Sequence, residues 1–296
     1  MSEIVWTQWD DLVVPPGFTK LSPNNRSLDG DISDITFYVP LYMGGRKVLT
    51  YAKEMKSLKY FQLPNAGFED ALEFVNPGVT LLNARGVHDA STAELAVALS
   101  IACRRGFIEF FDSARENKWN HKRFPSLNDS KIFILGAGSI AQMIEKYLTP
   151  YQVEITKFSR SGVNGSTKIS ELDTLLPQAD VVILALPLNS ESTHLFNQKR
   201  LALMKDGAAI INVARGPVIE TSALITELKN KRLFAGLDVT DPEPLPDEHE
   251  LWKVPNCIIT PHVGGDSTAF EPRGKKLVEE QLMRIYRGEK LINIVN

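Results

Sequence analysis

The chain reads KIFILGAGSIA from Lys131 to Ala141. The apolar run predicts a buried parallel strand, and the glycines that follow it predict a tight turn into a helix. Gly136 permits that turn, Gly138 lets a pyrophosphate approach the backbone, and the small Ala141 lets the helix pack closely on the strand. The amides at the start of such a helix point at the phosphates. A Gly-x-Gly segment alone is often a plain turn, but in this context it predicts a dinucleotide-binding unit.

Further apolar runs downstream predict more strands of the same sheet. They lie at 153–158, 180–187, 208–213, 234–239 and 257–260, with helical segments such as 222–231 between them. Strands that alternate with helices predict a doubly wound parallel sheet of the Rossmann type. The runs are nearly continuous in apolar residues, as expected of strands that are covered on both faces.

The N-terminal part has a shorter alternation of its own. Its apolar runs predict strands at 35–39, 58–63 and 78–82. The pattern of 91–111 predicts a helix, with a capping box from Ser91 to Glu94. Near the C-terminus, a predicted helix at 271–286 leads to the apolar tail 291–295.

Length, composition and charge narrow the class of protein. The 296 residues suit about two domains, and 43% hydrophobic with 23% charged residues is ordinary for a soluble globular protein. A net charge of -3 without a long basic run argues against nucleic acid as a partner. Cys103 and Cys257 lie in apolar surroundings without C-x-x-C spacing, which predicts buried thiols in a reducing cytosol and no metal site. We see neither a signal peptide nor a membrane span, so we expect a cytoplasmic protein with no membrane partner.

Three short motifs near the C-terminus bring together an arginine, a carboxylate and a histidine. They read NVARG at 212–216, DVTDPEP at 238–244 and PHVGG at 261–265. Arg215 offers a two-pronged donor for a carboxylate or a polarised carbonyl. His262, when Glu243 holds it, makes a general acid or base near neutral pH. An isolated Arg, Glu or His is more often a surface residue, but the combination predicts a site that can reduce a keto acid.

Together, the glycine motif and these three motifs resemble the D-isomer-specific 2-hydroxyacid dehydrogenase family, whose members include glyoxylate/hydroxypyruvate reductases and phosphoglycerate dehydrogenases. The resemblance runs from roughly Lys59 to the C-terminus. It implies a Rossmann cofactor domain at 97–269, inserted in a smaller flavodoxin-like α/β substrate domain made of 1–96 and 270–296. It also implies a homodimer formed through the cofactor domain.

The resemblance implies roles for the catalytic residues Arg215, Glu243 and His262. His262 would donate a proton to the substrate's carbonyl oxygen while a hydride arrives at the carbon. Glu243 would hold one ring nitrogen of that histidine and favour the imidazolium. Arg215 would bind the substrate carboxylate and polarise the keto oxygen.

The substrate site implied by the resemblance also includes a loop in the N-terminal part. Asn65-Ala66-Gly67 matches the family's loop whose backbone amides receive the substrate carboxylate, although as a bare sequence it is only a turn. The predicted substrate contacts are Asn65, Ala66, Gly67, Arg215 and His262. The crossing segment departs from the family pattern because Arg85 stands where a proline is common. Arg85 and His88 either face the substrate or form local salt bridges, and the sequence leaves both open.

The predicted cofactor site gathers residues from the ends of several strands. Its members are Thr92, Gly136, Gly138, Ser139, Ile140, Ser159, Arg160, Ser161, Leu186, Pro187, Val213, Ala214, Asp238 and Gly264. Asp238 would accept a hydrogen bond from the nicotinamide carboxamide, by resemblance. The second strand of the unit ends in Ser159-Arg160-Ser161, without the acid that usually binds the ribose 2′-hydroxyl of NAD. A guanidinium and two hydroxyls suit a 2′-phosphate, so the sequence favours NADP, with NAD as the other possibility.

We therefore expect an NADPH-dependent reductase of small 2-keto acids such as glyoxylate or hydroxypyruvate. The enzymatic alternative is a phosphoglycerate dehydrogenase-like activity. A different class also stays open, because some relatives are nucleotide-sensing corepressors that bind protein partners. The set of Arg215, Glu243 and His262 favours an enzyme.

Overall fold

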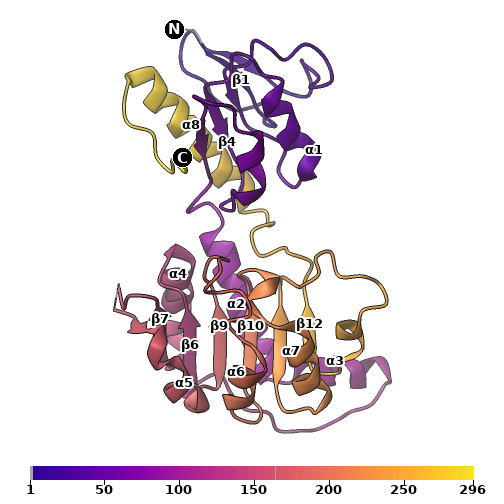
Figure 1. Cartoon of the computed structure of the whole chain (residues 1–296). Coiled ribbons are helices and arrows are strands. Elements are labelled where there is room, and N and C mark those ends of the chain that lie inside the picture. The colour runs from indigo at the N-terminus through magenta and orange to yellow at the C-terminus, as the bar shows by residue number, and fades with distance from the viewer. Residues whose placement is uncertain (1–2, 164) are drawn as a thin grey trace. The chain divides into compact units, whose positions relative to one another are not determined.

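The computed structural model describes residues 3–163 and 165–296, and these form two compact units (Figure 1). Unit 2 spans Asp89–Ser267, and unit 1 combines the chain up to His88 with Thr268–Asn296. The predicted insertion of one domain in the other is therefore confirmed. The first boundary lies at 88/89 rather than at the predicted 96/97, because helix α2 (Asp89–Arg104) is continuous and packs against the strands of unit 2. The second lies at 267/268 rather than 269/270.

Unit 1 is built on a five-stranded parallel sheet in the order β2-β1-β3-β4-β5, the flavodoxin-like order. Its strands are β1 (Ile4–Trp6), β2 (Thr19–Leu21), β3 (Phe37–Tyr38), β4 (Tyr60–Gln62) and β5 (Thr80–Leu82). Its helical elements are α1 (Gly45–Thr50), η1 (Tyr51–Lys53), η2 (Glu69–Phe74) and α8 (Phe270–Arg287). The sequence predicted β3, β4, β5 and α8, because these strands lie within the longer apolar runs 35–39, 58–63 and 78–82. It missed β1 and β2, because β1 is an apolar run of only three residues and β2 contains Thr19 and Lys20.

Successive residues along the strands of unit 1 point into different cores. Trp6 and Tyr38 belong to the core on one face, whereas Val5 and Phe37 pack in the other core together with α8. The C-terminal tail returns to this sheet, since Ile294 forms an antiparallel bridge with Leu82 at the edge strand β5. The expected return of the tail to the first domain is confirmed.

Unit 2 is built on a seven-stranded parallel sheet in the order β12-β11-β10-β9-β6-β7-β8. Its strands are β6 (Lys131–Leu135), β7 (Glu154–Ser159), β8 (Thr167–Lys168), β9 (Val181–Leu184), β10 (Ala209–Asn212), β11 (Phe234–Leu237) and β12 (Cys257–Ile259). Its α-helices are α2, α3 (Phe107–Arg115), α4 (Ser139–Leu148), α5 (Leu172–Leu175), α6 (Gln198–Leu203) and α7 (Thr221–Lys229). Its 3-10 turns are η3 (Thr149–Tyr151), η4 (Ile169–Glu171), η5 (Leu176–Gln178), η6 (Gly216–Val218) and η7 (Glu250–Lys253). The predicted doubly wound α/β fold is confirmed.

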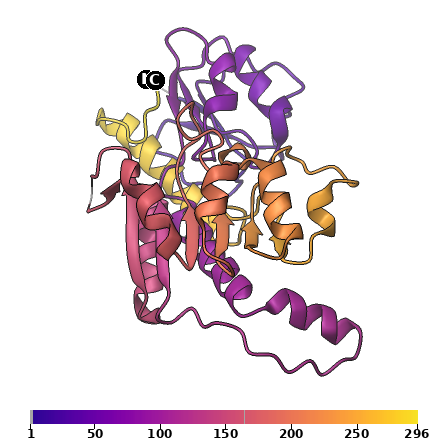
Figure 2. The ribbon, with the colours of Figure 1, turned by 60° about the horizontal axis from the view of Figure 1, so that its bottom comes forward.

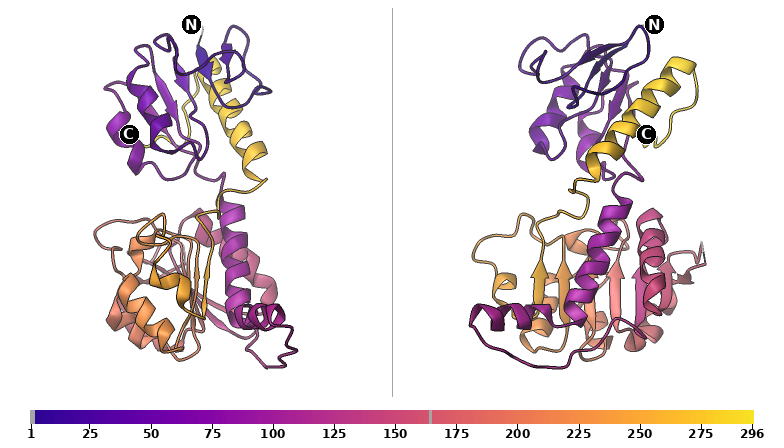
Figure 3. Two further views of the ribbon diagram at one scale, coloured as in Figure 1. Left: turned by 90° about the vertical axis from the view of Figure 1, so that its right-hand side faces the viewer. Right: turned by 180° about the vertical axis from the view of Figure 1, so that it is seen from behind.

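Helices cover both faces of the unit 2 sheet, with α2 and α4 on one side and α6 and α7 on the other (Figure 3). The central strand β6 shows why both faces must be covered. Ile132 and Ile134 belong to the core under α2 and α4, whereas Phe133 and Leu135 belong to the opposite core. The resulting sheet places all its strand ends at one carboxyl edge, where such folds bind ligands.

The helix predicted at 91–111 is two helices, because Gly106 interrupts it in a left-handed conformation with φ 66°. The predicted capping box is also wrong, since α2 begins at Asp89 and Ser91 already lies within the helix. After Gly106, α3 and the chain that follows it extend away from the sheet of unit 2 (Figure 2). This segment exposes large apolar side chains, of which Trp119 is 99% exposed.

Both cysteines are free thiols. Cys103 is buried as predicted, and burial raises the pKa of its thiol to about 12. Cys257 is half-buried by its exposed surface, although burial of the sulfur raises its pKa as well. Over the range that the structure describes, no helix has the length and apolar character needed to cross a bilayer.

Candidate active site

Arg215, Glu243 and His262 follow three neighbouring strands of unit 2. Arg215 comes after β10, Glu243 after β11 and His262 after β12, and these strands are adjacent in the sheet. Since the strands are parallel, their carboxyl ends meet at one edge. The topology therefore brings together residues that lie far apart in the sequence.

Glu243 and His262 form a direct pair. The carboxylate Oε1 of Glu243 accepts a hydrogen bond from Nδ1 of His262 at 2.5 Å. This bond raises the pKa of His262 above its usual range, against the opposing effects of burial and of the nearby Arg215 charge. The same bond lowers the pKa of Glu243. The pair therefore holds a protonated imidazole at pH values where a free histidine is neutral, with Nε2 left to exchange a proton.

Arg215 is placed by the loop that carries it. Asn212, which is buried at the end of β10, accepts from the backbone N–H of Ala214 at 3.0 Å and donates to the carbonyl of Arg215 at 3.0 Å. A side chain on Gly216 would overlap the carbonyl of Thr240, so this glycine lets the Arg215 loop lie against the loop that leads to Glu243. Because the Arg215 charge lowers the pKa of His262, the guanidinium is electrostatically coupled to the pair.

Asp238 holds the backbone of the His262 loop. Its carboxylate accepts hydrogen bonds from the Thr260 hydroxyl at 2.7 Å and from the backbone N–H groups of Val263 and Gly264 at 2.9 Å each. The side chain is buried, and His262 itself has a positive φ of 55°. Sequence reasoning missed this positioning role, since the contacts span more than twenty residues of chain. The role of Asp238 toward the nicotinamide stays a prediction.

The glycine turn after β6 has the form that a dinucleotide requires. Gly136 has a φ of 129°, and a side chain there would overlap the carbonyl of Ala185. Gly138 is different, because the space that a side chain would occupy there is open. Ala141 is fully buried, and α4 begins at Ser139, so the helix N-terminus faces this turn. These residues fit a bound pyrophosphate.

The other predicted cofactor residues lie around the same edge of the sheet. Leu186 and Pro187 follow β9, and Val213 and Ala214 follow β10. Thr92 in α2 lies close to Gly264, since its Cγ2 is 3.5 Å from where a Gly264 side chain would begin. Strand topology thus gathers these residues beside the glycine turn.

Ser159 is the last residue of β7, and Arg160 and Ser161 follow it. The side chains of Ser159 and Arg160 make different contacts. The Ser159 hydroxyl contacts Ser166 Oγ at 2.6 Å and accepts from the N–H groups of Gly162 and Val163, so it closes the turn after β7. The Arg160 side chain is 82% exposed, and its Nη2 lies 3.2 Å from Oε1 of Glu191. Arg160 is therefore the group at this strand end that is placed to bind an anion.

Comparison with known proteins shows the family of this chain. The family described as "D-isomer specific 2-hydroxyacid dehydrogenase, NAD binding domain" matches residues 97–264. The chain belongs to this family of D-2-hydroxyacid dehydrogenases. It is 31% identical to a glyoxylate reductase of Thermofilum pendens over 95% of this chain and 85% of the relative. It is 32% identical to a hydroxypyruvate reductase of Thermotoga maritima over 76% of this chain and 77% of the relative.

A solved structure shares the whole fold of this dehydrogenase. It is a D-isomer-specific 2-hydroxyacid dehydrogenase family protein from Aeromonas salmonicida, with a TM-score of 0.86 and 26% identity, covering 100% of this chain and 98% of that one. The chain is thus an oxidoreductase that transfers a hydride between a nicotinamide cofactor and a 2-keto or 2-hydroxy acid.

In unit 1 of the dehydrogenase, the predicted substrate loop Asn65–Gly67 follows β4. Its carbonyls are hydrogen-bonded to the segment after β5. The carbonyl of Asn65 accepts from the N–H of Ala84, and the carbonyl of Ala66 accepts from Nδ2 of Asn83, each at 2.8 Å. His88 makes a further hydrogen bond to this loop, since its Nε2 lies 2.8 Å from the carbonyl of Pro64. We expected His88 either to face substrate or to form a local salt bridge, and its buried ring instead holds this loop.

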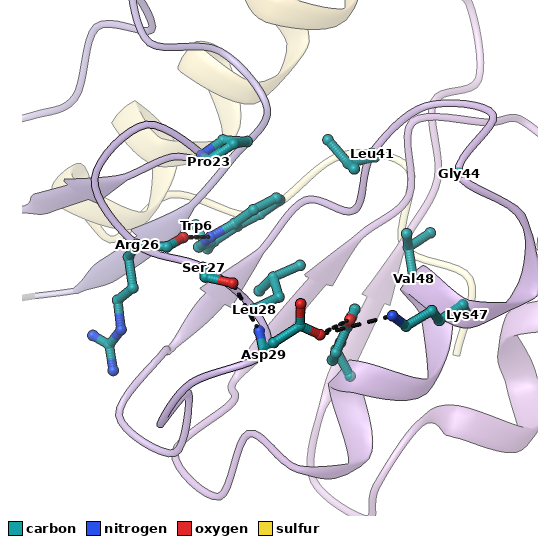
Figure 4. A pocket seen from close by; sticks show the side chains of 11 residues that line it. Trp6, Pro23, Arg26, Ser27, Leu28, Asp29, Leu41, Gly44, Lys47 and Val48 are labelled. Atoms are coloured by element: carbon teal, nitrogen blue, oxygen red, sulfur yellow. Dashed lines mark hydrogen bonds and ion pairs between the residues drawn. The ribbon is translucent and has the colours of Figure 1, made fainter.

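Unit 1 also contains a small cavity of about 340 Å³ (Figure 4). Trp6, Leu28 and Val48 give it apolar walls, and Asp29 lies at its rim near Lys47. No residue of the predicted site lines this cavity. Its polar groups already contact one another or the backbone, as Figure 4 shows for Asp29 and Trp6. The cavity is therefore distinct from the predicted site.

The Glu243–His262 pair gives the dehydrogenase a predictable pH dependence. With His262 as the predicted proton donor, the rate of reduction should fall as pH rises through the raised pKa of this residue. Glu243→Gln removes the carboxylate that raises that pKa, and the fall should then begin at a lower pH. Rates of keto-acid reduction measured from pH 5 to about pH 10 would show the shift. An alkaline limb that stays in place would count against the pairing.

Proposed function

We propose that this dehydrogenase reduces small 2-keto acids such as glyoxylate or hydroxypyruvate with NADPH. The observation that carries the proposal is the His262–Glu243 pair, with its raised histidine pKa, next to the charge of Arg215. A protonated donor and a guanidinium at one sheet edge suit a substrate that has a carbonyl beside a carboxylate. Relatives named glyoxylate reductase and hydroxypyruvate reductase support the choice of small substrates.

In the proposed mechanism, Arg215, Glu243 and His262 each have one role. Arg215 binds the substrate carboxylate with its planar fork and polarises the keto oxygen. The nicotinamide cofactor, when bound, supplies the hydride. Nε2 of His262 gives its proton to the carbonyl oxygen, while Glu243 keeps Nδ1 bonded and stabilises the imidazolium before transfer. The His262 side chain is 44% exposed, so it can recover a proton from water.

A panel of keto acids and hydroxy acids tests the proposal. Purified protein should oxidise NADPH in the presence of glyoxylate or hydroxypyruvate. Preferred oxidation of 3-phosphoglycerate would favour the phosphoglycerate dehydrogenase-like alternative. Saturable nucleotide binding with negligible turnover on every acid would instead favour a corepressor-like binding protein.

The proposed NADPH preference depends on Arg160. A charge-assisted hydrogen bond contributes about 1.5 to 3 kcal/mol, so Arg160→Ala should weaken NADPH binding by roughly 10- to 150-fold. NADH lacks the 2′-phosphate, and its affinity should hardly change. Fluorescence titration of both reduced cofactors would measure this. Arg105→Ala is the control, because Arg105 is exposed directly after α2, at the end far from Thr92. Equal affinities in the wild-type protein would contradict the preference.

We also infer that the dehydrogenase is a homodimer through unit 2. The segment that begins with α3 has no buried residue in its helix, and Phe107, Phe111 and Trp119 are all exposed. A group of large apolar side chains on an extended segment is typical of a protein contact. The mass in solution, measured by light scattering at several concentrations, tests whether two chains associate.

A further inference from the structure

Arg160 and Glu191 lie in the loops that follow the two strands flanking β6, namely β7 and β9. β7 and β9 both pair with β6 in parallel. Two hydrogen bonds link the end of β6 to its neighbours. The N–H of Gly136 donates to the carbonyl of Phe158 in β7, and the N–H of Ala185, directly after β9, donates to the carbonyl of Leu135, each at 2.8 Å. Arg160 and Glu191 follow those two flanking positions along the chain. An ion pair between them therefore spans the glycine turn where the dinucleotide is expected.

The loop that carries Glu191 is well defined by hydrogen bonds. Asn189 Oδ1 accepts from the N–H groups of Glu191 at 2.9 Å and Ser192 at 3.1 Å. The Ser192 hydroxyl donates to the carbonyl of Pro187 at 2.8 Å, which fixes the loop to the end of β9. This turn holds the backbone of Glu191 in place, so its carboxylate is presented to Arg160 by a fixed loop.

We propose that Glu191 is a specificity-determining residue that competes with the cofactor's 2′-phosphate for Arg160 and so limits the preference for NADPH. This inference rests on the proposed role of Arg160 in cofactor choice. A phosphate that binds the Arg160 guanidinium must displace the Glu191 carboxylate or lie beside it, and both cost binding free energy. NADH carries no 2′-phosphate and leaves the ion pair intact.

The size of the effect follows from the exposure of the pair. The two side chains are 82% and 58% exposed, so water and salt screen their attraction. Exposed ion pairs of this kind change an equilibrium by about 2- to 5-fold. Glu191 therefore adjusts the cofactor preference, whereas Arg160 creates it.

The test measures NADPH and NADH binding to the Glu191→Gln protein by fluorescence, without substrate. NADPH should bind about 2- to 5-fold more tightly than to the wild-type protein, and NADH should bind as before. The gain should shrink as salt rises, because ions screen both the pair and the phosphate. Glu154→Gln is the matched control, since Glu154 is an exposed, ion-paired glutamate at the opposite end of β7. That control should leave both affinities unchanged.

A second background shows whether Glu191 acts through Arg160. In the Arg160→Ala protein, Glu191→Gln should no longer tighten NADPH binding. Unchanged or weaker NADPH binding by Glu191→Gln in the wild-type background would overturn the inference, even where Arg160 still sets a preference. A further outcome is that the wild-type protein binds the two cofactors equally while the Glu191→Gln protein binds NADPH more tightly. That result would refute the wild-type preference and support the role of Glu191. Equal affinities in both proteins would refute both.

Discussion

His262→Ala should lower the rate of keto-acid reduction by roughly 10²- to 10⁴-fold, the usual range for loss of a general acid. The physical reason is that the substrate oxygen gains negative charge as the hydride arrives, and the variant has no proton donor in its place. Nδ1 of the wild-type ring is bonded to Glu243, so Nε2 is the nitrogen whose loss matters. The measurement is kcat and kcat/KM for glyoxylate and hydroxypyruvate with saturating NADPH.

Binding measurements separate this chemical loss from a structural one. The loop that carries His262 is held by Asp238 through the backbone of Val263 and Gly264, which the substitution leaves intact. NADPH affinity and the melting temperature should therefore stay near those of the wild-type protein. His121→Ala is the matched control, because His121 is exposed in the segment after α3 and should not affect the rate. Turnover near the wild-type value in His262→Ala would remove His262 from the mechanism.

The sequence predicted unit 2 well because its signals are local. Apolar runs such as Ile132–Leu135 mark buried parallel strands, and the Gly136 turn marks where a helix must follow. The alternation of these strands with helices then predicts a doubly wound parallel sheet, although not its strand order. Unit 1 was harder, since β1 is an apolar run of only three residues and β2 contains Thr19 and Lys20, which leaves little local signal. The break at Gly106 was missed because a single glycine also occurs within helices.

The motifs identified the three catalytic candidates, but not how the fold places them. Asp238 binds backbone groups more than twenty residues away, and this depends on β11 and β12 being neighbours. Ser159 looked like a phosphate ligand in the sequence, whereas its hydroxyl closes a turn in the structure. Glu191 had no motif at all, because only the sheet order brings its loop to Arg160. Long-range contacts of this kind leave no local signal.

Arg215→Lys should lower kcat/KM for keto acids by roughly 10²- to 10³-fold, as expected when a donor that stabilises the developing oxyanion is lost. Lysine keeps the positive charge, so the fall in kcat/KM reports the contribution of the planar guanidinium, whose paired donors an ammonium cannot reproduce. The loop itself should survive, because Asn212 holds it through the backbone of Ala214 and Arg215. NADPH binding should accordingly be unchanged, and Arg105→Lys provides a control for the conservative change at an exposed arginine.

The pH profile distinguishes the charge of Arg215 from its geometry. The Arg215 charge lowers the pKa of His262, so Arg215→Gln should move the alkaline limb of reduction to higher pH. Arg215→Lys should leave that limb in place while its kcat/KM falls, because the charge persists and the fork does not. If the lysine variant instead works as well as the wild-type protein, Arg215 is structural. The substrate carboxylate would then be held elsewhere, and Arg85, which is exposed after β5, would be the next residue to replace.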